Sequence, residues 1–407
     1  MTDSTPEPGS SGFRYFLSGV GTGSLLGGLQ IVIYPWLIAG VLQESADRVG
    51  FAQMMAMLPA LLFVLWGGAL SENRHQGRLL FRLYLLYLIP YGLMMGLVLT
   101  GSISYLLVVL FGFGYGAITA FIQPARESLL PKVASGHLNR AVARMSLVQF
   151  ACQSLGMFAA GWLDQLGLVV MVSLQMAAVV ITAFLLKYSH QNPDVETVRR
   201  VGVNTRVIAG LKLAWQHLQL RHLMAAVFAT GFLGLGVYLV VLPLLAREFY
   251  GGGAAFFAWL QLTFTAGVIV ANLLVIRGLS NRWRAGRFMV VSLLIRGGLL
   301  VLLACHLPSW GVFAVIFFWG LFSGWSMVLG RTMVHEVAPS SYASRMVSVY
   351  QLSLFGAAPL GAWSCGHLVA WLGLLPAIAW FGSLTIIAGL WMVWRSTLFS
   401  GEVATSP

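Results

Sequence analysis

The chain has 407 residues, of which 58% are hydrophobic and only 9% are charged, and its mean hydropathy is +0.84. Soluble domains carry about 25% charged residues, so a chain of this composition would leave large apolar patches exposed to water. These numbers exclude a soluble protein and indicate a membrane protein. The net charge of +12 must then be explained by where the basic residues lie.

The apolar stretches predict twelve transmembrane helices, and therefore an all-α membrane protein. Each stretch is near the 20 or so apolar residues that cross the hydrocarbon core of a bilayer. Together they leave no room for a sizeable soluble domain. The predicted spans cover residues 13–42, 49–71, 79–100, 103–123, 140–163, 167–187, 222–246, 254–276, 288–306, 309–330, 344–370 and 374–395.

The basic residues give these spans an orientation. An even number of spans places both termini on one side of the membrane. The 24 basic residues all lie on that side, except Arg48 and Arg247 on the opposite side and Arg296 inside a span. The positive-inside rule therefore predicts cytoplasmic termini for a multi-pass protein of a bacterial-type inner membrane. The same distribution explains the positive charge as topology, so no nucleic-acid partner is expected.

One long polar stretch divides the chain into halves of similar length. Within it Val207, Leu211, Trp215 and Leu218 recur at helical spacing, which predicts an amphipathic helix on the membrane surface; an ordinary connector is the alternative. The predicted domains are an N-terminal six-helix bundle over 1–188, a cytoplasmic linker over 189–221 and a C-terminal six-helix bundle over 222–407.

The two halves also resemble each other in sequence. Residues 69–79 align without gaps to 278–288, at an offset of 209 residues. A second match at an offset of 205 residues pairs Arg126 with Arg331 and Gly156 with Gly361. Both matches relate a segment near span n to one near span n + 6, which predicts two pseudo-symmetric six-helix bundles with substrate between them.

The loop after the second span carries a family signature. Gly68, Glu72, Gly77 and Arg78 resemble the Gly-x-x-x-Asp-Arg-x-Gly-Arg-Arg loop of the major facilitator superfamily, with Glu in place of Asp and two extra residues before Gly-Arg. Other segments resemble its enterobactin-exporter and macrolide-efflux branch. These are residues 30–37, 124–131, 149–161, 210–213 and 345–361.

Small, polar and aromatic residues recur on one face of spans one, four, seven and ten. On any single helix such a face is typical of close helix packing. The family resemblance implies that these four helices line the central cavity. The predicted substrate-facing residues on them are Gln30, Tyr34, Gln123, Tyr238, Trp319 and Ser323.

Arg296 lies nine residues past Arg287, which places it about 13 Å into the membrane at 1.5 Å per residue. A charge at that depth is costly and usually has a purpose. It is either a seventh substrate-binding residue, for an anionic or carbonyl-rich ligand, or a structural cation bonded to backbone carbonyls or to Asn272 or Gln261. Ninth helices of the superfamily are usually outer supports, which favours the structural role.

The charged loops predict a gate on the side of the termini. The resemblance implies that Glu72 pairs with Arg78 or Arg126, or caps the start of span eleven near Ser344, in the outward-facing state. A loose charged turn is the alternative. The predicted gating residues are Gly68, Glu72, Gly77, Arg78, Arg126, Gly286, Arg287, Arg331 and Arg345.

The sequence contains none of three common enzyme motifs. His335 and Glu336 are not part of a zinc-binding HExxH helix, and neither a Gly-x-Ser-x-Gly elbow nor a phosphate-binding loop occurs. No catalytic residue, metal site or cofactor is predicted. All twelve acidic residues can be placed in tails, loops or span ends, with Glu127 and Asp164 nearest to a span interior. Proton coupling is therefore implied by the resemblance alone.

These features predict a monomeric secondary active transporter that works by alternating access. The expected activity is export of a small amphipathic organic molecule, such as a drug-like compound or a siderophore, with protons as the coupling ion. The alternatives are a facilitator or importer of another organic solute, or a protein of the same fold that acts as a sensor or assembly partner without transport.

Overall fold

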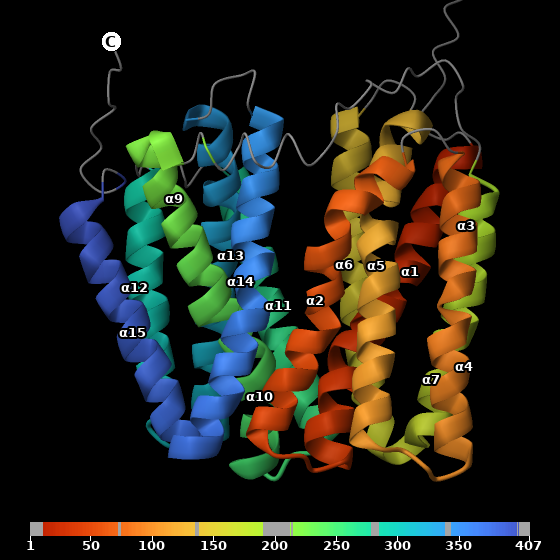
Figure 1. The fold of residues 1–407 in the computed structure, drawn as a ribbon, viewed down its shortest axis with the longest axis horizontal. Coiled ribbons are helices and arrows are strands. Elements are labelled where there is room, and N and C mark those ends of the chain that lie inside the picture. The colour runs from red at the N-terminus through yellow and green to blue at the C-terminus, as the bar shows by residue number, and fades with distance from the viewer. Residues whose placement is uncertain are drawn as a thin grey trace, which may run out of the picture. The chain divides into compact units, whose positions relative to one another are not determined.

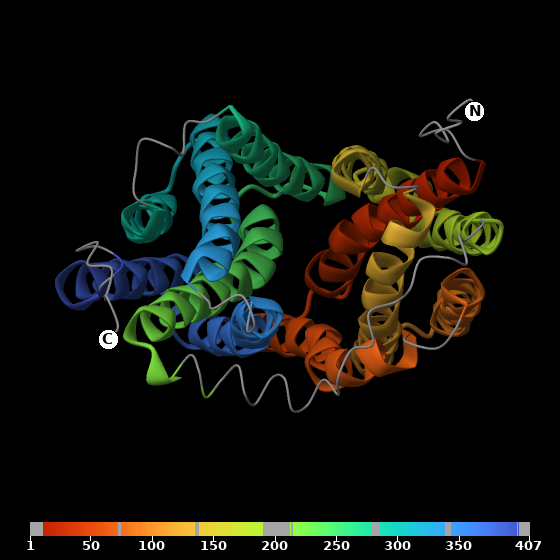
Figure 2. The ribbon, with the colours of Figure 1, turned by 90° about the horizontal axis from the view of Figure 1, so that it is seen from above.

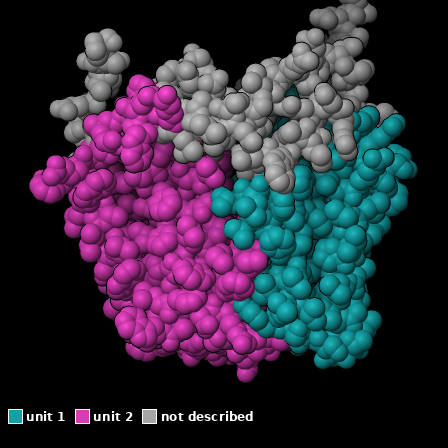
Figure 3. All heavy atoms as spheres, viewed as in Figure 1, with its two compact units in different colours: residues 1–37, 58–203 teal, residues 38–57, 204–407 magenta. Residues whose placement is uncertain are grey.

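The computed structural model describes residues 11–71, 75–134, 138–189, 212, 215–277, 285–337, 343–396 and 398. These residues form helices and short connections, and no strand occurs among them. The chain divides into two compact units, coloured separately in Figure 3. Unit 1 comprises residues 1–37 and 58–203, and unit 2 comprises residues 38–57 and 204–407.

Long apolar runs form the helices of the first half of the chain (Figure 1). One span is broken only at Tyr87, where α3 ends and α4 begins. The helices are α1 (Ser11–Trp36) with the π-helical turn η1 (Leu37–Val41), α2 (Ala46–Ser71), α3 (Gln76–Leu86), α4 (Leu88–Leu99), α5 (Tyr105–Val133), α6 (Leu138–Ala160) and α7 (Leu163–Lys187).

The second half repeats this order (Figures 1 and 2). Its first span is again irregular, because a π-helical turn separates two α-helical pieces. Gly373, with φ of 87°, is the single residue between the last two helices. The helices are α9 (Leu218–Ala229), η2 (Thr230–Leu235), α10 (Gly236–Glu248), α11 (Ala254–Ile276), α12 (Ala285–Leu303), α13 (Ser309–Val337), α14 (Ala343–Leu372) and α15 (Leu374–Arg395).

The prediction of twelve membrane-crossing helices is confirmed. Ten spans among the described residues are long and apolar enough to cross a bilayer, and α2 and α6 complete the twelve. Large apolar side chains such as Leu147, Ile276 and Ile89 are exposed, as a lipid-facing surface requires. Two helices run past the predicted ends of their spans: α5 continues past residue 123 to Val133, and α13 continues past residue 330 to Val337.

Close helix crossings explain part of the sequence repeat. In unit 1 the backbone of Gly156 on α6 packs against the Leu25 carbonyl of α1. In unit 2 the backbone of Gly361 on α14 packs against the Phe232 carbonyl of η2. A side chain at either glycine would collide with backbone, which small residues in membrane helices avoid. The two glycines, 205 residues apart, therefore make the same packing contact in each half of the chain.

The predicted domain boundaries stay a prediction. The two compact units differ from them at residues 38–57, which contact the second half of the chain although they precede most of the first half in sequence. The predicted amphipathic helix of the linker lies outside the described residues, apart from Lys212 and the residues from Trp215 onward. Trp215 is among the most exposed aromatic residues described.

Candidate functional site

Gln30 lies in a buried polar cluster of unit 1. Its side-chain oxygen accepts hydrogen bonds from the Tyr91 hydroxyl of α4 at 3.1 Å and from the Gln175 amide of α7 at 2.9 Å. All three side chains are buried. Polar groups in a membrane interior need such partners, so the predicted substrate residue Gln30 also joins α1 to two other helices.

Tyrosine rings surround this cluster. Tyr87 stacks on Tyr115 with ring centroids 5.0 Å apart, and its hydroxyl hydrogen-bonds Thr119 at 2.7 Å. The predicted substrate residue Tyr34 lies beside Phe111, with ring centroids 6.3 Å apart, and covers the backbone of Gly112. Gly112 on α5 therefore leaves the space that the Tyr34 ring of α1 occupies.

Three polar residues form a hydrogen-bonded row near the C-terminal end of α5. The Arg126 guanidinium donates to the Gln123 side-chain oxygen at 2.9 Å, and the Gln123 amide donates to Glu127 at 3.1 Å. Arg126 is 9% exposed, and its Nε finds no acceptor among the described residues. The structure thus joins Gln123, a predicted substrate residue, to Arg126, a predicted gating residue.

Unit 2 holds a second aromatic cluster with an amide. The Tyr238 hydroxyl of α10 donates to the Gln261 side-chain oxygen of α11. The centroid of the Tyr238 ring lies 4.4 Å from the Phe264 ring centroid and 5.8 Å from the Trp319 ring centroid. Two of the six predicted substrate-facing residues, Tyr238 and Trp319, are therefore in direct ring contact. Ser323, one helical turn further along α13, is half-buried.

Arg296 is 3% exposed within unit 2. Its Nη2 donates to the Thr230 hydroxyl at 3.0 Å and its Nε to the Ser292 carbonyl at 3.2 Å. The side-chain partners named from the sequence are engaged elsewhere, because Asn272 donates to a carbonyl of its own helix and Gln261 accepts from Tyr238. These contacts hold the guanidinium between α12 and η2.

Arg296 also occupies a repeated position. It lies 205 residues after Tyr91, the same offset that relates Gly156 to Gly361. Tyr91 donates to Gln30 on the first span of unit 1, and Arg296 donates to Thr230 on the irregular first span of the second half. Each half therefore links its third span to its first by a buried side-chain hydrogen bond.

The predicted gating residues are only partly described. Glu72 lies outside the described residues, and the side-chain surroundings of Gly68 and Arg345 also lie outside them. Gly77 is buried and Arg78 exposed in the first turn of α3; likewise Gly286 is buried and Arg287 exposed in the first turn of α12. Arg331 is exposed near the end of α13. The described residues therefore do not show the predicted gate assembled.

Several polar contacts were not predicted from the sequence. The Lys132 ammonium of α5 donates to Gln76 of α3 at 2.8 Å, and the Trp36 indole donates to Asp164 at 3.3 Å. Gln175 is the single amide of predicted span 167–187, and Gln261 shares predicted span 254–276 only with Asn272; that rarity is the signal by which the two glutamines stand out. Their partners lie on other helices, so the sequence pattern of one helix does not reveal them.

Comparison with known proteins gives the relatives of this chain. A family model described as "Transmembrane secretion effector", from the major facilitator superfamily, matches residues 9–406. A staphyloferrin A transporter of Staphylococcus aureus (strain NCTC 8325 / PS 47) is 22% identical over 327 residues, which are 78% of this chain and 80% of the relative.

Solved structures of transporters share the fold. A D-xylose-proton symporter has a TM-score of 0.74 at 14% identity and covers 95% of this chain and 98% of its own. A POT family transporter in complex with a thioalcohol-conjugated peptide has a TM-score of 0.76 at 12% identity, covering 98% and 99%. A nucleoside transporter has a TM-score of 0.73 at 10% identity, covering 93% and 98%. These likenesses confirm the predicted fold of two pseudo-symmetric six-helix bundles.

Proposed function

Because the chain belongs to the transmembrane secretion effector family of the major facilitator superfamily, we propose that it exports a small amphipathic organic molecule by alternating access. It is a multi-pass membrane transporter and not an enzyme. The exported compound is drug-like or a siderophore. It crosses a bacterial-type inner membrane in which both termini face the cytoplasm, as the basic residues indicate.

The observation that carries this proposal is a matched pair of clusters, one in each unit. Gln30 and Tyr34 lie among tyrosine rings in unit 1, and Tyr238 and Trp319 lie with Gln261 in unit 2. Aromatic rings provide apolar contact while amides and hydroxyls provide hydrogen bonds. Ligand sites of transporters combine a mostly apolar lining with a few polar groups, which suits an amphipathic compound.

The relatives support the same direction and class. The family description names secretion, and the relative from Staphylococcus aureus transports staphyloferrin A. Coupling to protons is supported by the D-xylose-proton symporter, which shares the fold. A substrate-binding role for Arg296 stays a prediction, because the contacts of its guanidinium are with Thr230 and Ser292.

The test is an efflux assay in a susceptible host that lacks its own drug pumps. Expression is expected to lower the accumulation of amphipathic dyes or siderophores, and a proton uncoupler should abolish that difference. Trp319→Leu removes an aromatic ring of the proposed substrate cluster, in which Trp319 contacts Tyr238. It should therefore weaken efflux at unchanged protein level. Trp310→Leu is the matched control on the same helix, since Trp310 is 76% exposed at the start of α13.

The outcomes separate the alternatives. Raised accumulation in expressing cells would establish an importer or facilitator instead of an exporter. Unchanged accumulation of every compound, with the protein present in the membrane, would favour the sensor or assembly role. An equal loss of efflux in Trp319→Leu and Trp310→Leu would contradict the assignment of the unit 2 cluster to the substrate.

A further inference from the structure

Residues 38–57 form what we call the corner segment: most of η1, the turn that follows it, and the first half of α2. It belongs to unit 2, whereas α1 and the rest of α2 belong to unit 1. The chain therefore leaves unit 1 after Leu37 and returns to it at Leu58. The first span changes units near its end, at η1, and α2 changes units near its middle.

Both ends of the corner segment coincide with irregularities in the helices. Pro35 lies in the last turn of α1 and is followed at once by the π-helical turn η1. Pro59 lies inside α2, two residues after Met57. Proline removes a backbone hydrogen bond and crowds the preceding turn, and π-helical turns and prolines are the usual sites of helix kinks. The corner segment is thus bounded by two points at which a helix bends easily.

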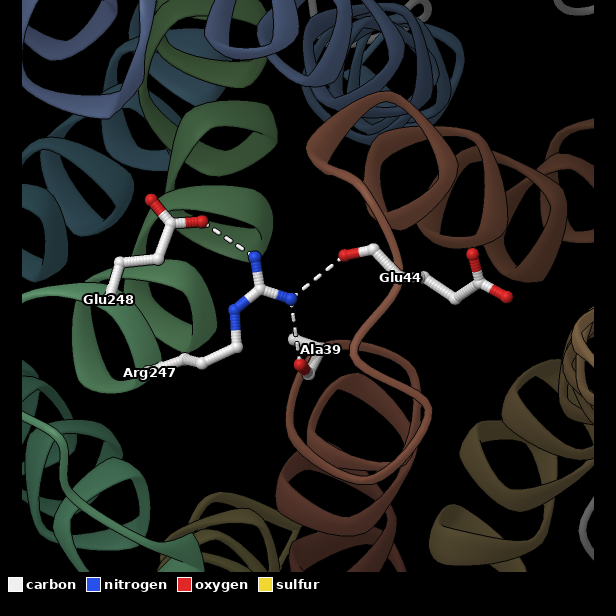
Figure 4. A network of polar contacts seen from close by, with 4 residues as sticks. All are labelled: Ala39, Glu44, Arg247 and Glu248. Carbon is white, nitrogen blue, oxygen red and sulfur yellow. Dashed lines mark hydrogen bonds and ion pairs between the residues drawn. The ribbon is translucent and has the colours of Figure 1, made fainter.

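The side chain of Arg247, on α10, binds backbone carbonyls of the corner segment (Figure 4). Its Nη1 donates to the Ala39 carbonyl at 2.9 Å and to the Glu44 carbonyl at 2.8 Å, while its Nη2 pairs with Glu248 at 2.6 Å. The Ala39 carbonyl lies near the C-terminal end of η1, where carbonyls lack donors within the helix and carry partial negative charge. The Glu44 carbonyl lies in the turn before α2. The planar guanidinium fork matches two such acceptors at once.

A flat crossing completes the contact. A Cβ at Gly50 of the corner segment would meet the Ala362 carbonyl at 2.5 Å and the Gly366 Cα at 2.9 Å. Reciprocally, a Cβ at Gly366 on α14 would meet the Ala46 carbonyl at 2.5 Å. The corner segment and α14 therefore touch backbone to backbone at Gly50 and Gly366.

We propose that Arg247 is a positioning residue for transport, which latches the corner segment onto α10 and α14. The segment is released, bending at Pro35 and Pro59, each time the protein opens toward the membrane face where α10 ends. The latch depends on the guanidinium and on backbone carbonyls, and on no acidic side chain of the corner segment. This inference rests on the proposed alternating-access mechanism but not on the direction or compound of transport.

The test measures exposure of the corner segment without any substrate. In a background of Cys152→Ala, Cys305→Ser and Cys365→Ala, the variant Ala46→Cys places a thiol in the first turn of α2, where Ala46 is 7% exposed. Purified protein in nanodiscs is labelled with a water-soluble maleimide. Arg247→Gln is expected to raise the labelling rate about fivefold to tenfold, as the loss of charge-assisted hydrogen bonds predicts. Arg247→Lys should lie between it and the parent.

Arg48→Gln is the matched control. Arg48 lies in the corner segment itself, is 54% exposed, and pairs with the Glu44 carboxylate at 2.8 Å. Its loss removes the same charge without touching the two carbonyls, so labelling should stay at the parent rate. Equal labelling of Arg247→Gln and the parent would overturn the latch. An equal rise in Arg247→Gln and Arg48→Gln would also overturn it, because that result would show a general effect of charge.

A second variant covers the case in which Arg247→Gln does not fold. Gly366→Ala pushes against the Ala46 carbonyl and should also raise labelling of the thiol at position 46. Parent-level labelling of folded Gly366→Ala protein would overturn the proposal. Labelling needs no transported compound, so a negative export assay would not change the labelling result. Conversely, a labelling result that overturns the latch would not contradict the proposed export.

Discussion

Glu127 is a carboxylate within a described helix that shares one amide with an arginine. Gln123 donates to Glu127 while it accepts from Arg126. A change at the Glu127 carboxylate would therefore reach Arg126 through the Gln123 side chain. If protons drive transport as proposed above, this row offers a path from a carboxylate to a change in side-chain contacts.

We therefore predict that Glu127→Gln uncouples transport. The variant keeps a hydrogen-bond acceptor beside Gln123 but removes the titratable group, so proton-driven transport in vesicles should fall about tenfold or more, as for loss of a general proton carrier. Counterflow without a proton gradient should remain. Asp164→Asn is the matched control, because Asp164 accepts from Trp36 at the start of α7. Normal gradient-driven transport by Glu127→Gln would contradict the coupling role.

His75 precedes α3 and offers a prediction for pH. Burial, together with the nearby charges of Arg78 and Lys132, lowers its pKa below the usual value of about 6.5. The folded protein then binds fewer protons than the unfolded chain as the pH falls below that value, so stability is lost as the pH drops through the folded pKa. The stabilising contribution is fully present above about pH 6.5.

His75→Gln is expected to flatten the fall in melting temperature between about pH 7 and pH 5. Thermal unfolding of detergent-solubilised protein measures it. At about pH 8, where the imidazole is neutral in both states, the pH dependence of variant and parent should run parallel. An unchanged slope on the acid side would show that other groups dominate acid destabilisation.

At the scale of elements, helix crossings depend on single glycines. A Cβ at Gly28 of α1 would meet the Gln153 backbone carbon at 2.9 Å and the Met157 nitrogen at 3.0 Å on α6. A Cβ at the preceding Gly27 would meet nothing within 4 Å. Adjacent glycines of one helix therefore have opposite tolerance for a side chain.

Gly28→Ala is predicted to lower the free energy of unfolding by about 1–3 kcal/mol, because backbone must move to accept the added carbon. Gly27→Ala should be neutral or stabilising by about 0.5–1 kcal/mol, since alanine favours a helix over glycine. Melting temperatures of the two variants, measured side by side in the same detergent, provide the comparison. Similar melting temperatures would show that the α1 and α6 crossing adjusts freely.

At the scale of the whole molecule, two independent features mark the ends of the spans. Basic residues gather on the side of the termini. The three most exposed tryptophans described lie at helix ends: Trp371 at 81%, Trp394 at 79% and Trp310 at 76%. Aromatic rings prefer the membrane interface. The charges predict the orientation, and these aromatic residues predict the depth.

The orientation can be tested with reporters. A fluorescent protein fused after residue 407 should be bright, and alkaline phosphatase at the same position inactive, because both report a cytoplasmic C-terminus. The reverse pattern should appear when the reporters follow residue 251, in the short connection between α10 and α11. Active phosphatase at the C-terminus would contradict the predicted topology.

The sequence predicted the spans well because their signal is local. Predicted spans 254–276 and 374–395 coincide with α11 and α15, since twenty apolar residues need no knowledge of their neighbours. The extension of α5 to Val133 was missed because a helix can continue into water on polar residues. Apolar length measures the span and not the helix.

The site was harder to predict because it depends on contacts between helices. A stripe on α1 selects the face that carries Gln30 and Tyr34, but not the rotation of α4 and α7 that brings Tyr91 and Gln175 to it. The partner of Arg296 lay in a span 66 residues earlier. Rotation and depth of each helix are set by packing, which a pattern on one helix does not contain.

The buried hydrogen bond of Arg296 has a consequence for biogenesis. A span with a central guanidinium enters lipid poorly on its own, at a cost of about 2.5–3.5 kcal/mol on insertion scales. Synthesis runs from the N-terminus, so the span that carries Thr230 leaves the ribosome before α12 does. The acceptor is thus already in the bilayer when the cation arrives. Thr230→Val should therefore impair membrane integration of α12 during translation, before any transport is at stake.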